Sequence, residues 1–409
     1  MSVNDSTRIL VAGTGPVGLL SALAFAQAGF GVVIAGPPAR ADDGRTTALM
    51  VPALKVLDRI GVLGELSKDA APLKTMRIID GTSRLIRSPI VTFRAGEIGE
   101  DHFGYNFRNS VLNAVLERAV TGHSGIEWRR ALVEHWQLGP DLATATLSDG
   151  TLVQSALAVA ADGRGSPARQ AAGISSSSRA LPQAALVLNF AHSRDHAFTS
   201  TEFHTETGPF TVVPLPGRRS SLVWVVRPET ARQLADLDDA ALSVRIERQM
   251  QSMLGRVTVD GGRQIYPLST SLPQRFGQNR IALVGEAAHV FPPIGAQGLN
   301  LGIRDVDQLV EIAAKHAADP GSAAALAAYD SSRRPDILAR TGAVNLLNMS
   351  LLSDMLPAQM ARGLGLNVLG GFSPIRAFFM REGLRPGSGF AAIAASLRAP
   401  GRIRDTRHD

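Results

Sequence analysis

The stretch RILVAGTGPVG, residues 8–18, decides how this chain begins to fold. The four apolar residues Ile9–Ala12 predict a buried β-strand, and the apolar spacing over Leu19–Ala28 predicts a helix directly after the glycines. A second apolar run, Val32–Ala35, predicts another strand. The order strand, glycine-rich turn, helix, strand indicates a βαβ unit at the start of an α/β domain.

The glycines of this turn follow the pattern G-x-G-x-x-G, with Gly13, Gly15 and Gly18 in the three glycine positions. Such a loop lets backbone N–H groups approach a pyrophosphate, whose charge the helix N-terminus stabilises. A simple βα turn is the alternative, but the position of the motif in a βαβ unit favours dinucleotide binding. The acidic residue expected after the second strand is missing, because Gly36 stands there.

The composition is that of a globular protein large enough to enclose a cofactor. The chain has 409 residues, of which 45% are hydrophobic and 19% charged, so two or three domains are expected. It has no cysteine, which excludes disulfides, thiolate catalysis and cysteine-based metal sites. We predict no metal site, and redox chemistry would need a bound organic cofactor.

The net charge of +6 permits three interpretations: nucleic acid, an anionic membrane surface, or solubility alone. No nucleic-acid motif or basic stripe with interleaved aromatic residues is present, so we expect no nucleic-acid partner. The short polar start Met1–Arg8 lacks the features of a signal peptide, which predicts a cytoplasmic protein. No run of about 18 apolar residues predicts a transmembrane helix.

Later patterns predict two kinds of structure. Helices are expected at Ala48–Ile60, Val111–Val120, Ala240–Met253 and Leu299–Ala314, with strands at Ala156–Ala161 and Ile281–Val284. Short β-branched runs at Leu186–Ala191, Phe210–Leu215 and Ser220–Val226 predict a separate antiparallel sheet. Leucine, methionine and phenylalanine clusters beyond Leu346 predict short amphipathic helices.

Two further motifs complete an ordered series. Asp162-Gly163 ends an apolar strand, a place where an isolated Asp-Gly is usually a turn. Farther along, the strand at Ile281–Val284 leads to Gly285-Glu286 and His289, and the glycine-rich stretch Pro292–Gly302 then opens a long helix. A helix N-terminus in this place can stabilise negative charge on a reduced flavin ring. A glycine-rich βα connection explains single glycines here but not the whole series.

The three motifs, in this order and spacing, resemble the flavoprotein monooxygenases that include p-hydroxybenzoate hydroxylase. The chain is similar in particular to the ubiquinone-biosynthesis FAD-dependent hydroxylases, and the similarity extends over essentially its whole length. The stretches that carry this narrower resemblance are Asp43–Leu49, Phe103–Asn109, Phe203–Pro216, Ser221–Trp224, Tyr266–Leu268 and Pro292–Asp305.

The resemblance implies an α/β fold with a Rossmann-like FAD-binding domain, an inserted antiparallel β-sheet substrate domain and a helical C-terminal region. The implied boundaries are 1–73, 101–178 and 276–345 for the FAD-binding domain, 74–100 and 179–275 for the substrate domain, and 346–409 for the C-terminal region.

The resemblance also implies roles for single residues. Those expected at FAD are Gly13, Gly15, Pro16, Gly18, Arg45, Arg108, Asp162, Gly163, Glu286, Pro293, Gly295, Gln297, Gly298, Leu299 and Asn300. Glu286 stands where the family has an aspartate, and Asp162 where the family places a residue that serves FAD and nicotinamide together. Pro293 and His289 are expected near the flavin, although a structural role is favoured for the histidine. His204, Trp224 and Tyr266 are candidates for a substrate pocket, with core packing as the alternative for each.

The implied reaction is hydroxylation of the aromatic ring of a polyprenylated phenol in ubiquinone biosynthesis, with NADPH or NADH as transient reductant and O2 as co-substrate, through a flavin C4a-hydroperoxide. Hydroxylation of a small soluble aromatic and a non-catalytic flavoprotein subunit of a lipid-biosynthesis complex are the alternatives. Because the polyprenyl tail of the substrate is hydrophobic, we expect peripheral association with the inner face of the membrane, through apolar and arginine residues of the C-terminal region. Delivery of the substrate by a complex of ubiquinone-biosynthesis proteins is the alternative.

Overall fold

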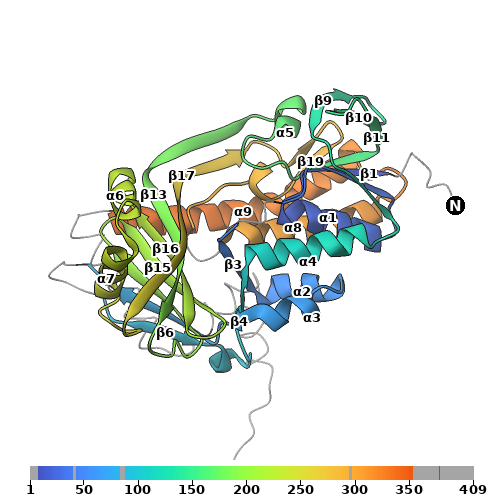
Figure 1. Cartoon of the computed structure of the whole chain (residues 1–409). Coiled ribbons are helices and arrows are strands. Elements are labelled where there is room, and N and C mark those ends of the chain that lie inside the picture. The colour runs from blue at the N-terminus through green and yellow to red at the C-terminus, as the bar shows by residue number, and fades with distance from the viewer. Residues whose placement is uncertain (1–7, 40–42, 83–87, 294–296, 353–376, 378–409) are drawn as a thin grey trace, which may run out of the picture.

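A computed structural model describes residues 8–39, 43–82, 88–293, 297–352 and 377. Figure 1 shows two bodies of secondary structure: a parallel sheet with helices α1 and α8 on one side of the molecule, and a large sheet with helices α6 and α7 on the other. A small sheet that contains β3 and β4 lies between them.

The first body is built on a six-stranded sheet in which β1 is central. Its strands, in spatial order, are β18 (Gly277–Gln278), β19 (Ile281–Leu283), β12 (Leu157–Ala160), β1 (Ile9–Ala12), β2 (Val32–Ala35) and β8 (Ile126–Arg129). All neighbours are parallel except β18 and β19. The predicted βαβ unit is present, with α1 over Pro16–Gln27 between β1 and β2.

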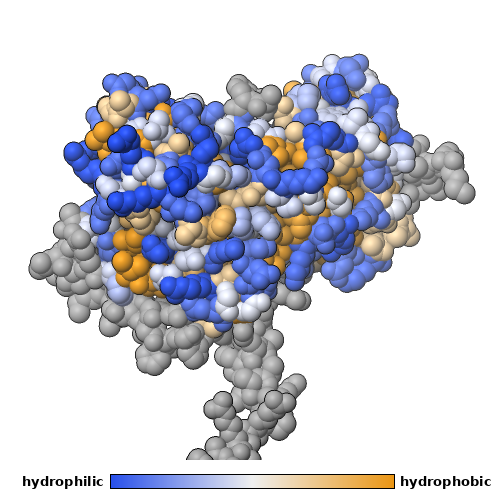
Figure 2. Space-filling model, turned by 60° about the horizontal axis from the view of Figure 1, so that its bottom comes forward, coloured by the Kyte–Doolittle hydropathy of each residue, from blue (hydrophilic) through white to orange (hydrophobic). Residues whose placement is uncertain are grey.

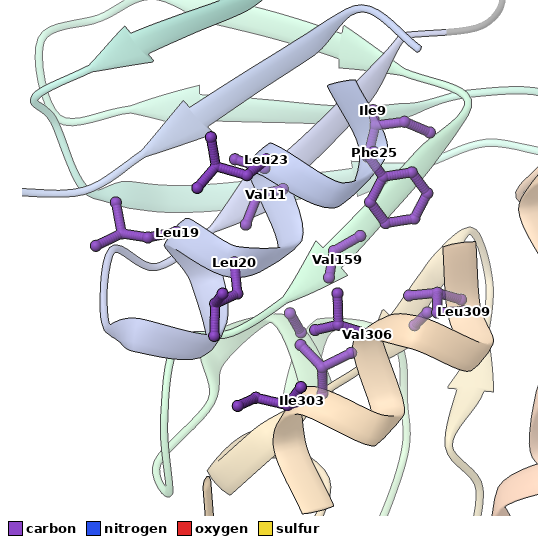
Figure 3. Packing of buried hydrophobic residues seen from close by; sticks show 14 of the residues in the cluster. Ile9, Val11, Leu19, Leu20, Leu23, Phe25, Val159, Ile303, Val306 and Leu309 are labelled. Carbon is purple, nitrogen blue, oxygen red and sulfur yellow. The ribbon is translucent and has the colours of Figure 1, made fainter. Parts of the chain in front are cut away.

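Alternation along β1 directs its side chains into two different layers. Ile9 and Val11 pack with α1 and with α8 (Gln297–Lys315) in the main core, where Val306 lies close to Val159 of β12 (Figure 3). Leu10 faces the other way, against a three-stranded sheet. That sheet consists of β9 (Val133–Leu138), β10 (Ala143–Leu147) and β11 (Leu152–Ser155). The cofactor-type motif is therefore fixed between two packed layers.

The second body is a seven-stranded sheet with two helices on one face. Its strands, in spatial order, are β17 (Val257–Pro273), β13 (Ser176–His192), β16 (Arg219–Val226), β15 (Gly208–Leu215), β14 (Thr199–Thr205), β5 (Thr75–Asp80) and β6 (Val91–Arg94). The predicted sheet is present, although β14 and β5 pair in parallel. Helices α6 (Pro228–Ala235) and α7 (Asp239–Gln249) cover a core that includes Phe210 and Trp224.

A small sheet joins the two bodies. It consists of β3 (Thr46–Met50), β7 (Gly104–Arg108) and β4 (Ala70–Pro72), with β7 in the middle. The helix predicted from Ala48 was wrong in its first residues, because Ala48–Met50 belong to β3 and helix α2 covers Val51–Arg59. The pairing of β3 with β7, more than fifty residues away in sequence, decides this local structure.

The remaining elements connect these sheets. They are α3 (Leu63–Leu66), η2 (Ser67–Asp69), η3 (Ala95–Ile98), α4 (Asn109–Thr121), α5 (Pro167–Ala171), η4 (Gly285–Ala287) and α9 (Ala323–Leu352). Helix α9 includes Pro335 and reaches Leu352, so the expected short helices beyond Leu346 lie largely outside the described residues. The domain boundaries stay a prediction; the seven-stranded sheet draws its strands from residues 75–94 and 176–273.

No helix of the described chain is long and apolar enough to cross a bilayer. Figure 2 shows one face of the molecule, on which hydrophobic residues reach the surface in separate patches among hydrophilic ones.

Candidate functional site

The glycine motif forms an open cradle at the N-terminus of α1. A Cβ on Gly13 would lie 2.3 Å from the Ala161 carbonyl oxygen, and one on Gly18 would lie 2.0 Å from the Gly13 oxygen, so both positions are closed by the fold. A Cβ on Gly15 would meet nothing within 4 Å. Gly15 is also the N-cap of α1, no side chain caps the helix there, and Pro16 occupies its first turn. The helix N-terminus is thus bare and accessible to an anion.

The missing acidic residue after β2 has a structural counterpart. Gly36 has a φ of +148°, and a Cβ on it would lie 2.8 Å from the Thr14 hydroxyl oxygen. That hydroxyl donates a hydrogen bond to the carbonyl oxygen of Pro37. The side chain of Thr14 therefore occupies the space into which a residue larger than glycine would extend.

The Asp162-Gly163 motif lies beside this cradle. The Ala161 N–H donates to the Ala12 oxygen at 2.8 Å, which aligns the end of β12 with the end of β1. Asp162 Oδ2 accepts a hydrogen bond from the Ala168 N–H at 3.0 Å, whereas its Oδ1 is buried without a partner among the described residues. Burial raises the pKa of the Asp162 carboxyl above its usual range. An unsatisfied buried carboxylate oxygen favours a ligand that can donate a hydrogen bond there.

The third motif closes the other side of the site. Glu286 in η4 forms an ion pair with Arg164, with 2.9 Å between Arg164 Nε and Glu286 Oε2. Both side chains are about half exposed, so solvent screens this pair. A Cβ on Gly302 of α8 would lie 2.8 Å from Val17 of α1, so the helix that follows the glycine-rich stretch packs closely on the first motif.

The first turn of α8 is tied to β3 through one asparagine. Asn300 Oδ1 accepts from the Met50 N–H, and Asn300 Nδ2 donates to the Ala48 oxygen, both at 2.8 Å. Gly298 is exposed, and Leu299 and Pro293 are partly buried. Gln297 begins the helix, and Gly295 lies outside the described residues.

Arg45 extends from the loop before β3 toward the large sheet. It forms a two-pronged ion pair with Asp43, at 2.8 and 2.7 Å, and its guanidinium lies 5.4 Å from the ring centroid of Tyr266. Burial alone would raise the pKa of the Asp43 carboxyl, but the hydrogen bonds and charge of Arg45 lower it overall. Arg108, the last residue of the middle strand β7, instead pairs with Asp69 of η2.

His289 belongs to a buried polar cluster beneath the site. His289 Nε2 lies 2.7 Å from Asp305 Oδ2, and Arg333 Nε donates to Asp305 Oδ1 at 2.8 Å. All three side chains are almost wholly buried. The Gly285 N–H also donates to Asp305 at 3.0 Å, so the cluster joins η4, α8 and α9. These contacts support a structural role for His289, which stays a prediction.

The three candidates for the substrate pocket, His204, Trp224 and Tyr266, do not all lie on the same face of the large sheet. Tyr266 lies on the face that meets Arg45. His204 is buried and pairs with Glu202 at 2.9 Å, on the same face as Tyr266 by the register of the strands. Trp224 lies on the opposite face, where its ring is 5.0 Å from that of Phe210 and covered by α6 and α7. Core packing, the alternative reading, therefore describes Trp224.

Sequence reasoning missed Thr14, Arg333 and Asn106. Asn106 is 1% exposed and reaches the carbonyl oxygen of Pro214 on the large sheet. The only sequence signal for these residues is a polar side chain within a predicted buried element, which does not by itself identify the partner.

The family model for the FAD binding domain matches residues 6–341. The chain belongs to the FAD-binding domain family. It is 34% identical over 393 residues to ubiquinone hydroxylase UbiL of Rhodospirillum rubrum, covering 94% of this chain and 90% of that protein. It is 30% identical to 3-demethoxyubiquinol 3-hydroxylase of Escherichia coli, covering 89% and 94% of the two chains. Within the family it therefore belongs with the FAD-dependent ubiquinone-biosynthesis hydroxylases.

Comparison of structures supports the fold. The p-nitrophenol 4-monooxygenase of Pseudomonas putida DLL-E4 superposes with a TM-score of 0.73 at 23% identity, covering 92% of this chain and 96% of that one. The predicted α/β fold of a p-hydroxybenzoate hydroxylase-like flavoprotein is confirmed, and FAD is the cofactor of this family.

Proposed function

We propose that this protein hydroxylates the aromatic ring of a polyprenylated phenol in ubiquinone biosynthesis, using FAD, O2 and NADH or NADPH. The observation that carries the proposal is the similarity to a ubiquinone hydroxylase along 94% of the chain, together with a bare cradle at the motif that such an enzyme needs. FAD, when bound, supplies the redox chemistry and the activation of O2, because the chain has no cysteine that could form a redox-active dithiol.

The residues that fit FAD come from all three motifs. Gly13, Gly15 and Gly18 with the α1 N-terminus fit the pyrophosphate. Of these three glycines, only Gly15 has open space in front of its backbone, where a phosphate group can approach. Asp162, with its unpartnered Oδ1, fits a hydroxyl or N–H donor of the cofactor. Glu286 and the first turn of α8 are proposed to lie along the ribityl chain and the flavin. Arg108, engaged with Asp69, has the weakest structural support among the proposed FAD residues.

The protein's own contribution is to position the ring and exclude water. The large sheet faces the small sheet and the loop around Arg45, and direct contacts such as the hydrogen bond from Thr46 Oγ1 to Ser221 Oγ at 2.8 Å join them. A site between two joined sheets can hold two reactants in a fixed geometry and limit the access of water. We place the aromatic ring there, with the prenyl tail leading toward a membrane or a lipid-carrying partner.

The test is made with the purified full-length chain. FAD content is measured from the flavin absorbance, and NADH and NADPH oxidation is followed with and without a prenylated phenol and a small soluble phenol. We expect faster oxidation with the prenylated phenol and a product heavier by one oxygen atom from 18O2. Faster turnover of the small phenol would instead favour the soluble-aromatic alternative, and bound flavin with no stimulation by either would favour the non-catalytic subunit.

A further inference from the structure

Asn106 lies on β7, where the small sheet meets the large sheet. It is opposite Ala48 in the pairing of β3 with β7, and the Ala48 oxygen accepts the hydrogen bond from Asn300 in the first turn of α8. On its other side, Asn106 Nδ2 donates to the Pro214 oxygen at 2.9 Å and to Ser221 Oγ at 3.4 Å. Only strand β3 therefore lies between Asn106 and Asn300 of the glycine-rich stretch, and Asn106 is also in contact with the large sheet.

The orientation of the Asn106 amide is fixed by its partner. A carbonyl oxygen such as that of Pro214 only accepts hydrogen bonds, so the amide nitrogen has to face it. Asn106 Oδ1 then points elsewhere, and it is buried with no hydrogen-bond partner among the described residues. An acceptor buried in this way costs about 1–3 kcal/mol unless a donor reaches it.

A second asparagine repeats the arrangement next to it. Asn189 is directly opposite Ser221 in the pairing of β13 with β16, and such cross-strand neighbours have Cβ atoms about 4.5–5.5 Å apart. Its Nδ2 donates to the Gly44 oxygen at 2.8 Å, which fixes this amide too, and its Oδ1 is likewise buried and unpartnered in the described structure. Ser221 is thus flanked by two asparagines, each with an amide oxygen that lacks a donor in the described structure.

The charged side chains of Arg45 and Asp43, which belong to the loop that Asn189 contacts, pair with each other. Arg45 is bound by both oxygens of Asp43, and Asp43 also accepts a hydrogen bond from Asn109. The two asparagine oxygens are neutral acceptors, so they favour a neutral O–H donor and disfavour an anion.

We propose that Asn106, assisted by Asn189, accepts a hydrogen bond from the ring hydroxyl of the phenolic substrate and selects the neutral free phenol over its ether. This inference rests on the proposed function and assigns the polar recognition within the same site. The two asparagines fix the orientation of the ring between the small sheet and the large sheet. The prenyl tail adds binding energy but does not orient the ring.

The experiment measures binding instead of turnover. The FAD-loaded full-length chain is dialysed to equilibrium against 2-prenylphenol, a probe with a single five-carbon prenyl unit, and against the methyl ether of the same compound. We expect the wild type to bind the phenol about three- to tenfold more tightly than the ether, in the range of one net hydrogen bond. In Asn106→Leu this preference should disappear. Asn106→Asp keeps an oxygen acceptor at the position, so below neutral pH it should retain more of the preference for the phenol than the leucine variant does.

Thr201→Val is the matched control. Thr201 is also buried with an unpartnered side-chain oxygen, but it lies on β14 on the same face as Phe203, among the residues covered by α6 and α7. This variant should keep the full preference for the phenol. Asn189→Leu gives the second measurement, and it replaces Asn106→Leu if that chain does not retain FAD.

Two results overturn the inference while leaving the proposed function intact. One is a wild type that turns over the prenylated phenol but binds phenol and ether equally; the other is a preference that survives in both leucine variants, which would assign the amide oxygens to buried water. A wild type that holds FAD but neither binds nor hydroxylates the phenol overturns the proposed function, and the inference with it.

Discussion

The three glycines of the first motif differ in what constrains them, although their residue type is the same. Gly18 is enclosed by protein, since a methyl group there would lie 2.0 Å from the Gly13 oxygen, whereas Gly15 faces open space. We expect Gly15→Val to keep the fold and lose FAD, because its side chain would occupy the space proposed for the pyrophosphate. Gly18→Ala should lower the free energy of unfolding by about 1–3 kcal/mol through overpacking. Thermal unfolding and flavin absorbance of the two chains check both expectations.

The outcome that would contradict this assignment is specific. A Gly15→Val chain with a full complement of FAD would place the pyrophosphate elsewhere. A Gly15→Val chain that unfolds in the absence of FAD would show that the open space has a structural role that the contacts do not reveal.

Glu286 is exposed and paired with Arg164, so its contributions to stability and to cofactor binding should separate. An exposed ion pair contributes about 0–1 kcal/mol to folding, so Glu286→Ala should change the unfolding free energy little. If the carboxylate also accepts a hydrogen bond from FAD, the same variant should weaken FAD binding at least tenfold, and Glu286→Asp should retain most of the affinity. FAD titration of the apoprotein measures this. Equal FAD affinity in wild type and alanine variant would restrict Glu286 to its pair with Arg164.

His192 provides a pH dependence of folding at the residue scale. Burial is the main cause that lowers the pKa of the His192 imidazole, and the neighbouring His196 adds to it. The ring is held by the Arg194 oxygen and by Ser220, at 2.7 and 3.0 Å. Because the folded pKa lies below the unfolded value of about 6.5, the unfolded chain binds more protons, and stability falls as the pH drops below 6.5.

The size of this effect is about 1.4 kcal/mol for every pKa unit that separates the folded from the unfolded state. Urea unfolding at pH 7.5 and pH 5.0 measures it, and His192→Phe should show a smaller loss between the two pH values than the wild type. An equal loss in both chains would assign the pH dependence to other groups.

At the scale of elements, the buried cluster around Asp305 holds η4, α8 and α9 together. Burial alone would raise the pKa of the Asp305 carboxyl, but His289 and Arg333 lower it overall, so it carries its charge at neutral pH. Asp305→Asn removes the fully buried one of the two carboxylates that pair with Arg333, the other being Asp336, and should cost about 3–5 kcal/mol. Denaturant unfolding checks this value. The control is Asp307→Asn, because Asp307 is exposed and pairs with Arg59 at the surface, and it should change stability by less than 1 kcal/mol.

Elements whose signal is local could be predicted from the sequence. The βαβ unit around Gly13–Gly18, helix α4 and strands β15 and β16 were placed within a few residues, since hydrophobic period and turn residues determine them. Strand β3 was partly misassigned, because its structure depends on pairing with β7. Strands β13 and β17 are 17 residues long, and only a part of β13 was predicted, since its Ser-rich start has no apolar alternation.

The same distinction separates the predicted from the missed site residues. A glycine that permits a close backbone approach leaves a spaced motif in the sequence, so the three motifs could be found and their convergence expected. Asn106, Arg333 and Thr14 depend on partners 23 to 108 residues away or on another helix, and no spacing identifies such partners. Motif chemistry was therefore predictable, and the buried polar contacts that orient it were not.

At the scale of the whole molecule, the chemistry of the proposed substrate sets a problem of delivery. Moving a prenyl tail from a bilayer into water costs about 0.8 kcal/mol for each CH2 group, so the ring has to arrive from a membrane or from a lipid-carrying partner. The chain has a net charge of +6, and Arg376, Arg381 and Arg385 stand among leucines and phenylalanines in the C-terminal sequence. Basic residues near an anionic surface contribute about 1 kcal/mol each, which favours direct docking on the membrane.

Co-sedimentation with vesicles distinguishes direct docking from delivery. We expect the FAD-loaded wild type to sediment with vesicles that contain anionic lipid, to do so less at high salt, and to sediment weakly with neutral vesicles. A triple change of Arg376, Arg381 and Arg385 to Gln should abolish the binding. The control triple, Arg179, Arg218 and Arg256 to Gln, removes the same charge from exposed positions of the large sheet and its connections and should leave most of the binding. Equal loss in both triples would mean that overall charge, and not the C-terminal region, draws the protein to the surface. If the wild type does not sediment and its turnover of a long-chain phenol requires a second protein, direct docking is wrong, because the free energy of extracting the tail must then come from a partner that carries the lipid.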